Sequence, residues 1–107
     1  MENNQAFERF TAIGEEMRSA HQAEFGQMFG KKVLKHKGKA FAAFYRDEMV
    51  FKLKGVAHRE ALSKEGAKLW DPSGKNMPMK EWVQVGQPFI ADWRELAESA
   101  LKSLEEK

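Results

Sequence analysis

The sequence predicts an α+β fold in two layers, with helices on one face of a five-stranded antiparallel sheet. Apolar residues recur every three or four positions near both ends of the chain, which is the period of a helix with one buried stripe. In the middle of the chain apolar and polar residues alternate, which is typical of strands. The links between consecutive strands are too short for parallel crossovers, so we expect antiparallel pairs. The predicted order is helix, three strands, helix, two strands, helix.

The first helix is expected from about Asn4 to His21. A side-chain oxygen of Asn3 or Asn4 suits its start, because this oxygen accepts a hydrogen bond from an N–H of the first turn. The inward positions of this helix are Phe7, Phe10, Ile13 and Met17.

Three strands are expected next, over residues 27–37, 39–45 and 49–54. The first contains apolar pairs among lysines and ends at a turn at Gly38. The second carries three aromatic residues, which suit a strand packed on at least one side. The third has the clearest alternation, in which Met49, Phe51 and Leu53 alternate with Val50, Lys52 and Lys54.

The second half of the chain predicts a short helix over 57–65 that Gly66 closes, then strands over 67–70 and 79–85 separated by a turn at 71–74. A last helix follows, with a proline in its first turn. Its apolar stripe consists of Phe89, Trp93, Leu96, Ala97, Ala100, Leu101 and Leu104.

Length and composition limit the function classes. The 107 residues are enough for one domain, 1–107, with its own core. The absence of cysteine excludes disulfides, cysteine zinc sites and thiol catalysis. No apolar run approaches the roughly 18 residues of a membrane span, and the first residues do not resemble a secretion signal. We therefore expect a cytoplasmic protein with no membrane contact.

No catalytic or metal-binding set is evident. The histidines His21, His36 and His58 fall in three different elements, and none has a second ligand at helical or strand spacing. The serines lack a nucleophile motif, no glycine loop has phosphate-binding spacing, and paired glutamates suit solvated helix surfaces. We expect no metal, no cofactor and no enzymatic activity.

The formal charge of +2 conceals a strong segmental pattern. Residues 1–25, 26–80 and 81–107 carry net charges of −3, +8 and −3, so a basic middle is flanked by acidic helices. Such a basic region is a candidate contact for nucleic acid or for an acidic partner. The lysines that form it on the predicted hairpin and the next strand are Lys31, Lys32, Lys35, Lys37, Lys39, Lys52 and Lys54.

A purely structural role explains the same lysines, because lysines on edge strands prevent aggregation. The cluster also lacks arginine for paired contacts to bases, and Phe41, Phe44 and Phe51 suit a core better than a stacking surface. A second interface candidate is the segment Met77, Pro78 and Met79, because its two methionines are not required by the adjoining turn.

The chain resembles the N-terminal domain of the TfoX/Sxy competence-regulator family from about Phe25 onward. The resemblance depends on the runs Met28-Phe29-Gly30, Gly38-Lys39-Ala40-Phe41-Ala42, Met49-Val50-Phe51-Lys52-Leu53, Trp70-Asp71-Pro72 and Trp93-Arg94-Glu95-Leu96-Ala97. In that family a second glycine and an aromatic residue follow the first run, whereas Lys31 and Lys32 stand here.

The resemblance implies a secretion-chaperone-like fold with a five-stranded sheet, in a stand-alone module without the family's C-terminal domain. It also implies a bacterial regulatory or protein-interaction role, linked in that family to competence and transcription. No catalytic set accompanies it, and we expect the motif residues to be structural: Met28, Phe29, Gly30, Gly38, Lys39, Phe41, Ala42 and Trp93.

Three hypotheses follow. The leading one is a non-enzymatic domain that binds a protein partner, with a homodimer formed through the sheet face that the helices leave open. The second is a non-specific nucleic-acid module that uses the lysine-rich hairpin. The third is an enzyme or small-ligand binder whose pocket the sequence does not reveal.

Overall fold

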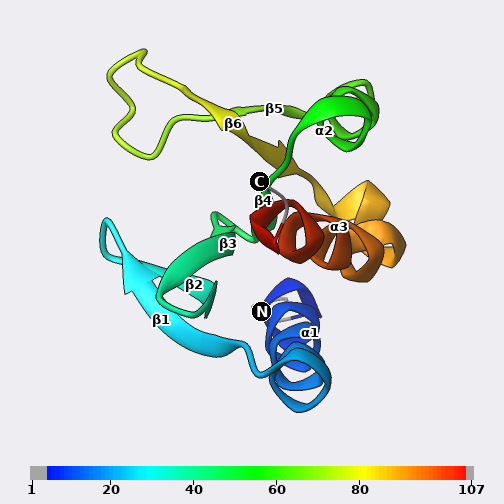
Figure 1. Ribbon diagram of the computed structural model, residues 1–107. Coiled ribbons are helices and arrows are strands. Elements are labelled where there is room, and N and C mark those ends of the chain that lie inside the picture. Colours follow the sequence, from blue (N-terminus) through cyan, green and yellow to red (C-terminus); the bar gives the residue numbers. More distant parts are fainter. Residues whose placement is uncertain (1–4, 106–107) are drawn as a thin grey trace.

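The computed structural model describes residues 5–105 and has an α+β fold with a six-stranded antiparallel sheet (Figure 1). The strands lie in the order β1-β2-β3-β4-β6-β5. Along the chain the elements are α1 (Gln5–His21), β1 (Glu24–Met28), β2 (Lys31–His36), β3 (Lys39–Tyr45), β4 (Glu48–Lys52), α2 (Gly55–Leu62), β5 (Lys68–Trp70), β6 (Met79–Val85), a 3₁₀ helix η1 (Gln87–Asp92) and α3 (Trp93–Glu105).

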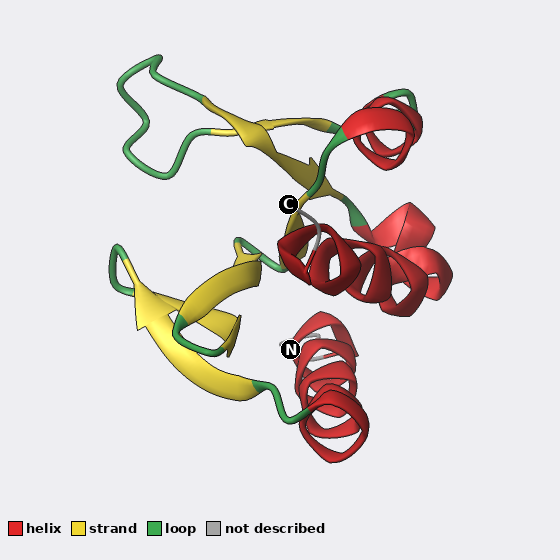
Figure 2. Ribbon diagram, in the orientation of Figure 1, coloured by secondary structure: helices red, strands yellow, loops and turns green. Residues whose placement is uncertain are grey.

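The helices cover one face of the sheet, as predicted (Figure 2). Phe10, Ile13 and Met17 of α1 are buried against the sheet, and the predicted stripe of the last helix packs beside them. Phe7 was predicted to point inward as well, but it lies at the border of the helix and is 39% exposed. Met49, Phe51 and Leu53 all point into this core, so the predicted alternation of β4 is confirmed. No helix within residues 5–105 is long and apolar enough to cross a membrane.

The other face of the sheet has a hydrophobic core of its own. The β1–β2 and β5–β6 hairpins reach away from α1 and α3 as two arms (Figure 1). Between them lies a cluster of buried residues with Trp70 at its centre, and the β1–β2 turn meets it through Phe29. The cluster, called here the second core, consists of Val33, Ala43, Tyr45, Val50, Trp70 and Trp82. The sheet therefore curls until the tip of the β1–β2 hairpin reaches Trp70 of β5, and most of the face predicted to be open is filled.

The expected five strands are wrong in number, because the segment 27–37 is not one strand. Phe29 and Gly30 have φ values of 56° and 74° and form a two-residue turn between β1 and β2. The added strand β1 begins at Glu24, where the sequence has glycine and polar residues in place of β-branched ones. An aromatic residue in the first position of such a turn is unusual, which is why the sequence did not indicate it.

Two helix boundaries also differ from prediction. The short helix is Gly55–Leu62, and Gly66 lies in the turn that follows, in the left-handed conformation with φ 83°. The last helix is interrupted, because Phe89, within η1, has non-helical φ and ψ angles of −111° and 27°, and α3 begins only at Trp93. The predicted cap at Asn3 or Asn4 lies outside the described residues.

Candidate interaction site

The predicted lysine cluster does not form one surface. Lys31 lies on the second-core face, with its Nζ 5.3 Å from the centre of the Tyr45 ring. Lys32 lies on the helix side, with its Nζ 5.9 Å from the ring of Phe7. Neighbouring residues of a strand point to opposite faces, so consecutive lysines are separated by the sheet. Lys37 occupies the exposed turn before β3.

Three other lysines line one cleft of about 470 Å³ beside the last turn of α3. Lys52 lies 3.9 Å from the Glu81 carboxylate, whereas Lys39 and Lys54 make no ion pair within residues 5–105. Lysines near the carboxyl end of a helix also complement its dipole, so the cleft has a structural explanation as well. The basic middle of the sequence is thus divided between the two faces of the sheet and this cleft.

Phe29 is the most unusual residue on the second-core side. It is 62% exposed, although its ring packs edge-on against buried Trp70 with 6.3 Å between ring centres. Its left-handed backbone conformation is uncommon for a bulky residue. Gly30 supplies the second left-handed position of the turn without a steric penalty. The turn therefore holds an aromatic ring at the surface, and buried Trp70 supports this ring from beneath.

Tyr45 packs against Trp70, the residue beneath Phe29, and also lies close to two positively charged side chains. Its ring, only 9% exposed as a residue, lies 5.7 Å from Trp70, and Trp70 lies 5.4 Å from Trp82. Lys31 and the Arg46 guanidinium lie 5.3 Å and 5.1 Å from the Tyr45 ring centre. Cations over an aromatic ring gain from its negative face. We call Phe29, Lys31, Tyr45 and Arg46 the aromatic–basic rim.

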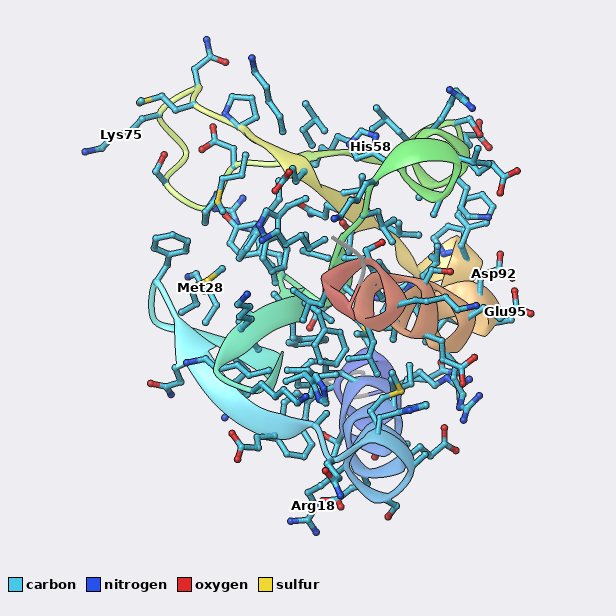
Figure 3. All side chains as sticks on the ribbon, viewed as in Figure 1. Arg18, Met28, His58, Lys75, Asp92 and Glu95 are labelled. Atoms are coloured by element: carbon cyan, nitrogen blue, oxygen red, sulfur yellow. The ribbon has the colours of Figure 1, made fainter. Side chains whose placement is uncertain are left out.

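Of the acidic groups beside this rim, Asp47 is exposed next to Arg46, and Glu48 is engaged by another side chain. The Glu48 carboxylate accepts a 2.6 Å hydrogen bond from Gln84, a buried side chain of β6. Figure 3 shows Met28 and Lys75, one on each arm, on the side of the molecule opposite Asp92 and Glu95. The acidic surface of the last helix thus faces away from the arms.

The loop between β5 and β6 carries the predicted segment Met77-Pro78-Met79. Met77 is 71% exposed, while Met79 packs partly against the second core. Asp71 organises the loop, because its carboxylate accepts hydrogen bonds from Ser73 Oγ at 2.9 Å and from the N–H groups of Gly74 and Met77 at 3.1 Å. Slight burial raises the pKa of Asp71, but these bonds outweigh it and place the pKa below its ordinary value of 3.8.

The residues on which the resemblance depends are divided between the core and the surface. Phe41, Ala42 and Trp93 are fully buried in the core beneath the helices. Gly38 has φ 81° in the turn before Lys39, and Met28 packs partly against the second core. Phe29 and Gly30 are exposed at the rim, so this motif contributes both a turn and a surface.

Sequence reasoning missed Tyr45 and Arg46 as surface residues, because Tyr45 ends the predicted strand 39–45 and Arg46 falls in the link after it. Their relation to Lys31 depends on the β2–β3 register, in which Val33 faces Ala43. The only signal in the sequence is that a lysine begins the first strand of this hairpin and a tyrosine–arginine pair ends the second, which places them at the same end of an antiparallel pair. No group of three or more histidines, cysteines, aspartates or glutamates within residues 5–105 could hold a metal ion.

Comparisons of the chain with protein families, with curated proteins and with solved structures find no match.

Proposed function

We propose that this chain is a non-enzymatic protein-interaction domain that binds an acidic partner segment at the aromatic–basic rim. The observation that carries the proposal is the exposed Phe29 ring, held in a left-handed conformation against a buried tryptophan. The role agrees with the regulatory or interaction function implied by the resemblance to the TfoX N-terminal domain.

The energetics of Phe29 favour a role in binding over a role in folding. A left-handed non-glycine residue costs roughly 1 kcal/mol, and the contact of the Phe29 ring with Trp70 offsets about as much, so Phe29 adds no net stability to the fold. Asn-Gly would form the same turn with less strain. Large aromatic residues on a rigid support are typical anchors of protein interfaces, because little side-chain entropy is lost when they bind.

The charges around the anchor indicate the chemistry of the partner. Lys31 and Arg46 flank Tyr45, and Lys35 lies on the same face, where its Cε would be 3.0 Å from a Cβ on Gly26. Complementary charge steers association and gives specificity. A partner segment with an apolar residue for Phe29 and carboxylates for these cations fits this surface best.

A random-peptide phage library tests this proposal directly. Selection on the wild-type chain should enrich peptides that place aspartate or glutamate beside an apolar residue. Phe29→Ser and the double change Lys31→Gln with Arg46→Gln should each weaken binding of the selected peptides about tenfold or more. Val56→Ser is the matched control, because Val56 is 57% exposed but lies on α2.

Two results would contradict this proposal. One is a selection without any enrichment. The other is a set of peptides that bind the Phe29→Ser variant as tightly as the wild type. Thermal unfolding of each variant would establish that the loss of binding is not a loss of the fold.

A second candidate function is non-specific nucleic-acid binding, favoured by the cleft that collects Lys39, Lys52 and Lys54. Phosphate contacts release condensed counterions, so this function requires affinity that falls steeply with salt. Changing all three lysines to glutamine should abolish binding of a short DNA duplex at low salt. Unchanged affinity in the triple variant, or affinity independent of salt, would eliminate it.

A further inference from the structure

The two edges of the sheet differ in how they are protected. At one edge, β5 is only Lys68–Trp70, its register with β6 is shifted between Leu69 and Trp70, and Pro72 follows it. Short length, irregular pairing and proline are features that usually prevent an edge strand from pairing with another chain. At the other edge, β1 is Glu24–Met28, pairs with β2 without a register shift, and contains neither proline nor lysine.

The β1–β2 register determines which backbone groups of β1 point outward. Met28 and Lys31 flank the two-residue turn and so exchange both hydrogen bonds, as Gly26 does with Val33 further along. The N–H and C=O groups of Phe25 and Gln27 therefore point away from β2. Within residues 5–105 these four groups have no hydrogen-bond partner.

An apolar groove of about 400 Å³ runs between α1 and this edge. Phe7 and Phe25 line it and are both exposed, and Lys32 lies at its border. Phe25 is held there because α1 has a glycine beneath it: a Cβ on Gly14 would lie 2.3 Å from the Phe25 ring. The edge thus offers free backbone groups beside exposed aromatic surface.

From these features we infer that β1 is a self-association edge, which pairs with β1 of a second copy of this chain in antiparallel register about a twofold axis at Gly26. In this register Phe25 lies opposite Gln27 of the second copy, and their outward groups form four hydrogen bonds across the axis. The inference does not depend on the proposed function of the aromatic–basic rim.

The sequence of β1 is self-complementary in this register. Its one charged residue, Glu24, lies opposite Met28 of the second copy, so no like charges meet. Gly26 lies opposite itself at a non-hydrogen-bonded position, where the two backbones approach most closely. Pairing also closes the one long exposed edge, which leaves a finite dimer with β5 at each end.

Sedimentation of the full chain tests this inference. We expect the mass to rise from one 12.3 kDa chain toward two as the concentration increases from about 10 μM to about 1 mM, since small interfaces are weak. Gln27→Pro removes an outward N–H without affecting the β2 ladder and should leave a folded monomer, as judged by circular dichroism. The matched control Gln27→Thr keeps the N–H and should dimerise like the wild type.

A single introduced cysteine tests the register, because the chain has no cysteine of its own. Gly26→Cys places two thiols across the axis at a spacing that suits a disulfide, and its Cβ meets only the flexible end of Lys35. Under mild oxidation we expect it to cross-link about tenfold faster than Gln27→Cys, which does not face itself.

A wild-type chain that stays monomeric at every concentration would overturn the inference. So would a dimer that persists in folded Gln27→Pro, because the contact would then lie on another surface. Equal cross-linking rates of the two cysteine variants would exclude the twofold register.

Discussion

The two faces of the sheet achieve burial by different means. On one face, helical stripes of α1 and α3 cover Met49, Phe51 and Leu53. On the other, the sheet curls on itself and covers Trp70, Trp82 and Tyr45 with its own two arms. The first core depends on the local periodicity of each segment. The second depends on the curvature of the whole sheet, and it leaves its closing residue, Phe29, at the surface.

This difference explains where exposed aromatic residues arise in a domain this small. A helix-covered core has most of its apolar residues enclosed beneath a charged outer face, and exposes aromatic rings only at its border with β1, at Phe7 and Phe25. A core closed by hairpin tips ends in aromatic residues that are supported from below and exposed above. The aromatic–basic rim is therefore a direct consequence of how the second core is closed.

The largest expected effect is on the core beneath the helices. Phe51→Ala removes a fully buried ring that packs where α3 meets the sheet. We expect it to lower the free energy of unfolding by about 3–5 kcal/mol, as truncation of a buried aromatic residue usually does. Urea unfolding with tryptophan fluorescence measures this. A loss below 1 kcal/mol would mean that the helices do not depend on this contact.

The helix-covered core was largely predictable, because its residues repeat with the period of their own element. The stripes of the first and last helices and the alternation of β4 need only local spacing. The second core was not, since the contact of Phe29 with Trp70 joins residues from opposite ends of the strand order. That contact depends on sheet curvature, which no short segment encodes.

The same limit explains the number of strands and the site. Three successive two-residue turns, at 29–30, 37–38 and 46–47, have positive φ at both positions. The first begins with phenylalanine, which is uncommon in such a turn, so the sequence does not indicate a turn there. The lysines were recognised from composition, but their separation follows from registers that composition does not contain. Tyr45 and Arg46 were missed for this reason.

A smaller loss of stability is expected where α1 packs against β1. Gly14→Ala adds a Cβ that would lie 2.3 Å from the Phe25 ring and 2.9 Å from Leu34. Overpacking of this kind costs about 1–3 kcal/mol, which exceeds the roughly 1 kcal/mol that alanine gains over glycine in a helix. Thermal unfolding should show a net decrease in stability. Stabilisation by Gly14→Ala would show that Phe25 moves away without cost.

At the aromatic–basic rim, one substitution should abolish peptide binding and leave the stability of the fold almost unchanged. Phe29→Asn creates an Asn-Gly turn, which relieves about 1 kcal/mol of left-handed strain and loses a ring contact with Trp70 worth about as much. We expect a change in unfolding free energy of less than about 1 kcal/mol, together with loss of the peptides selected by the rim. If the variant unfolds several kcal/mol more easily, Phe29 is a core residue rather than a binding anchor.

The smallest effect is expected on the local order of the loop that joins β5 and β6. Because hydrogen bonds from Ser73, Met77 and Gly74 lower the pKa of Asp71 despite its slight burial, its contribution to loop order is complete above the ordinary value of 3.8. That contribution is lost only as the pH falls below 3.8 and through the lowered pKa. Hydrogen exchange of the Met77 and Gly74 amides should therefore accelerate there, beyond its intrinsic pH dependence.

Asp71→Asn is the matched control for this titration. It keeps a side-chain oxygen as an acceptor, but the neutral amide does not titrate with pH. Its amide protection should be weaker than in the wild type above pH 3.8 and should show no step below it. The proposed binding residue Phe29 lies on the β1–β2 hairpin and not in this loop, so we expect the same peptide affinity in both proteins. A parallel loss of peptide affinity would show that the loop and the β1–β2 turn act as one surface, and the second core would then be a coupled unit rather than two independent arms.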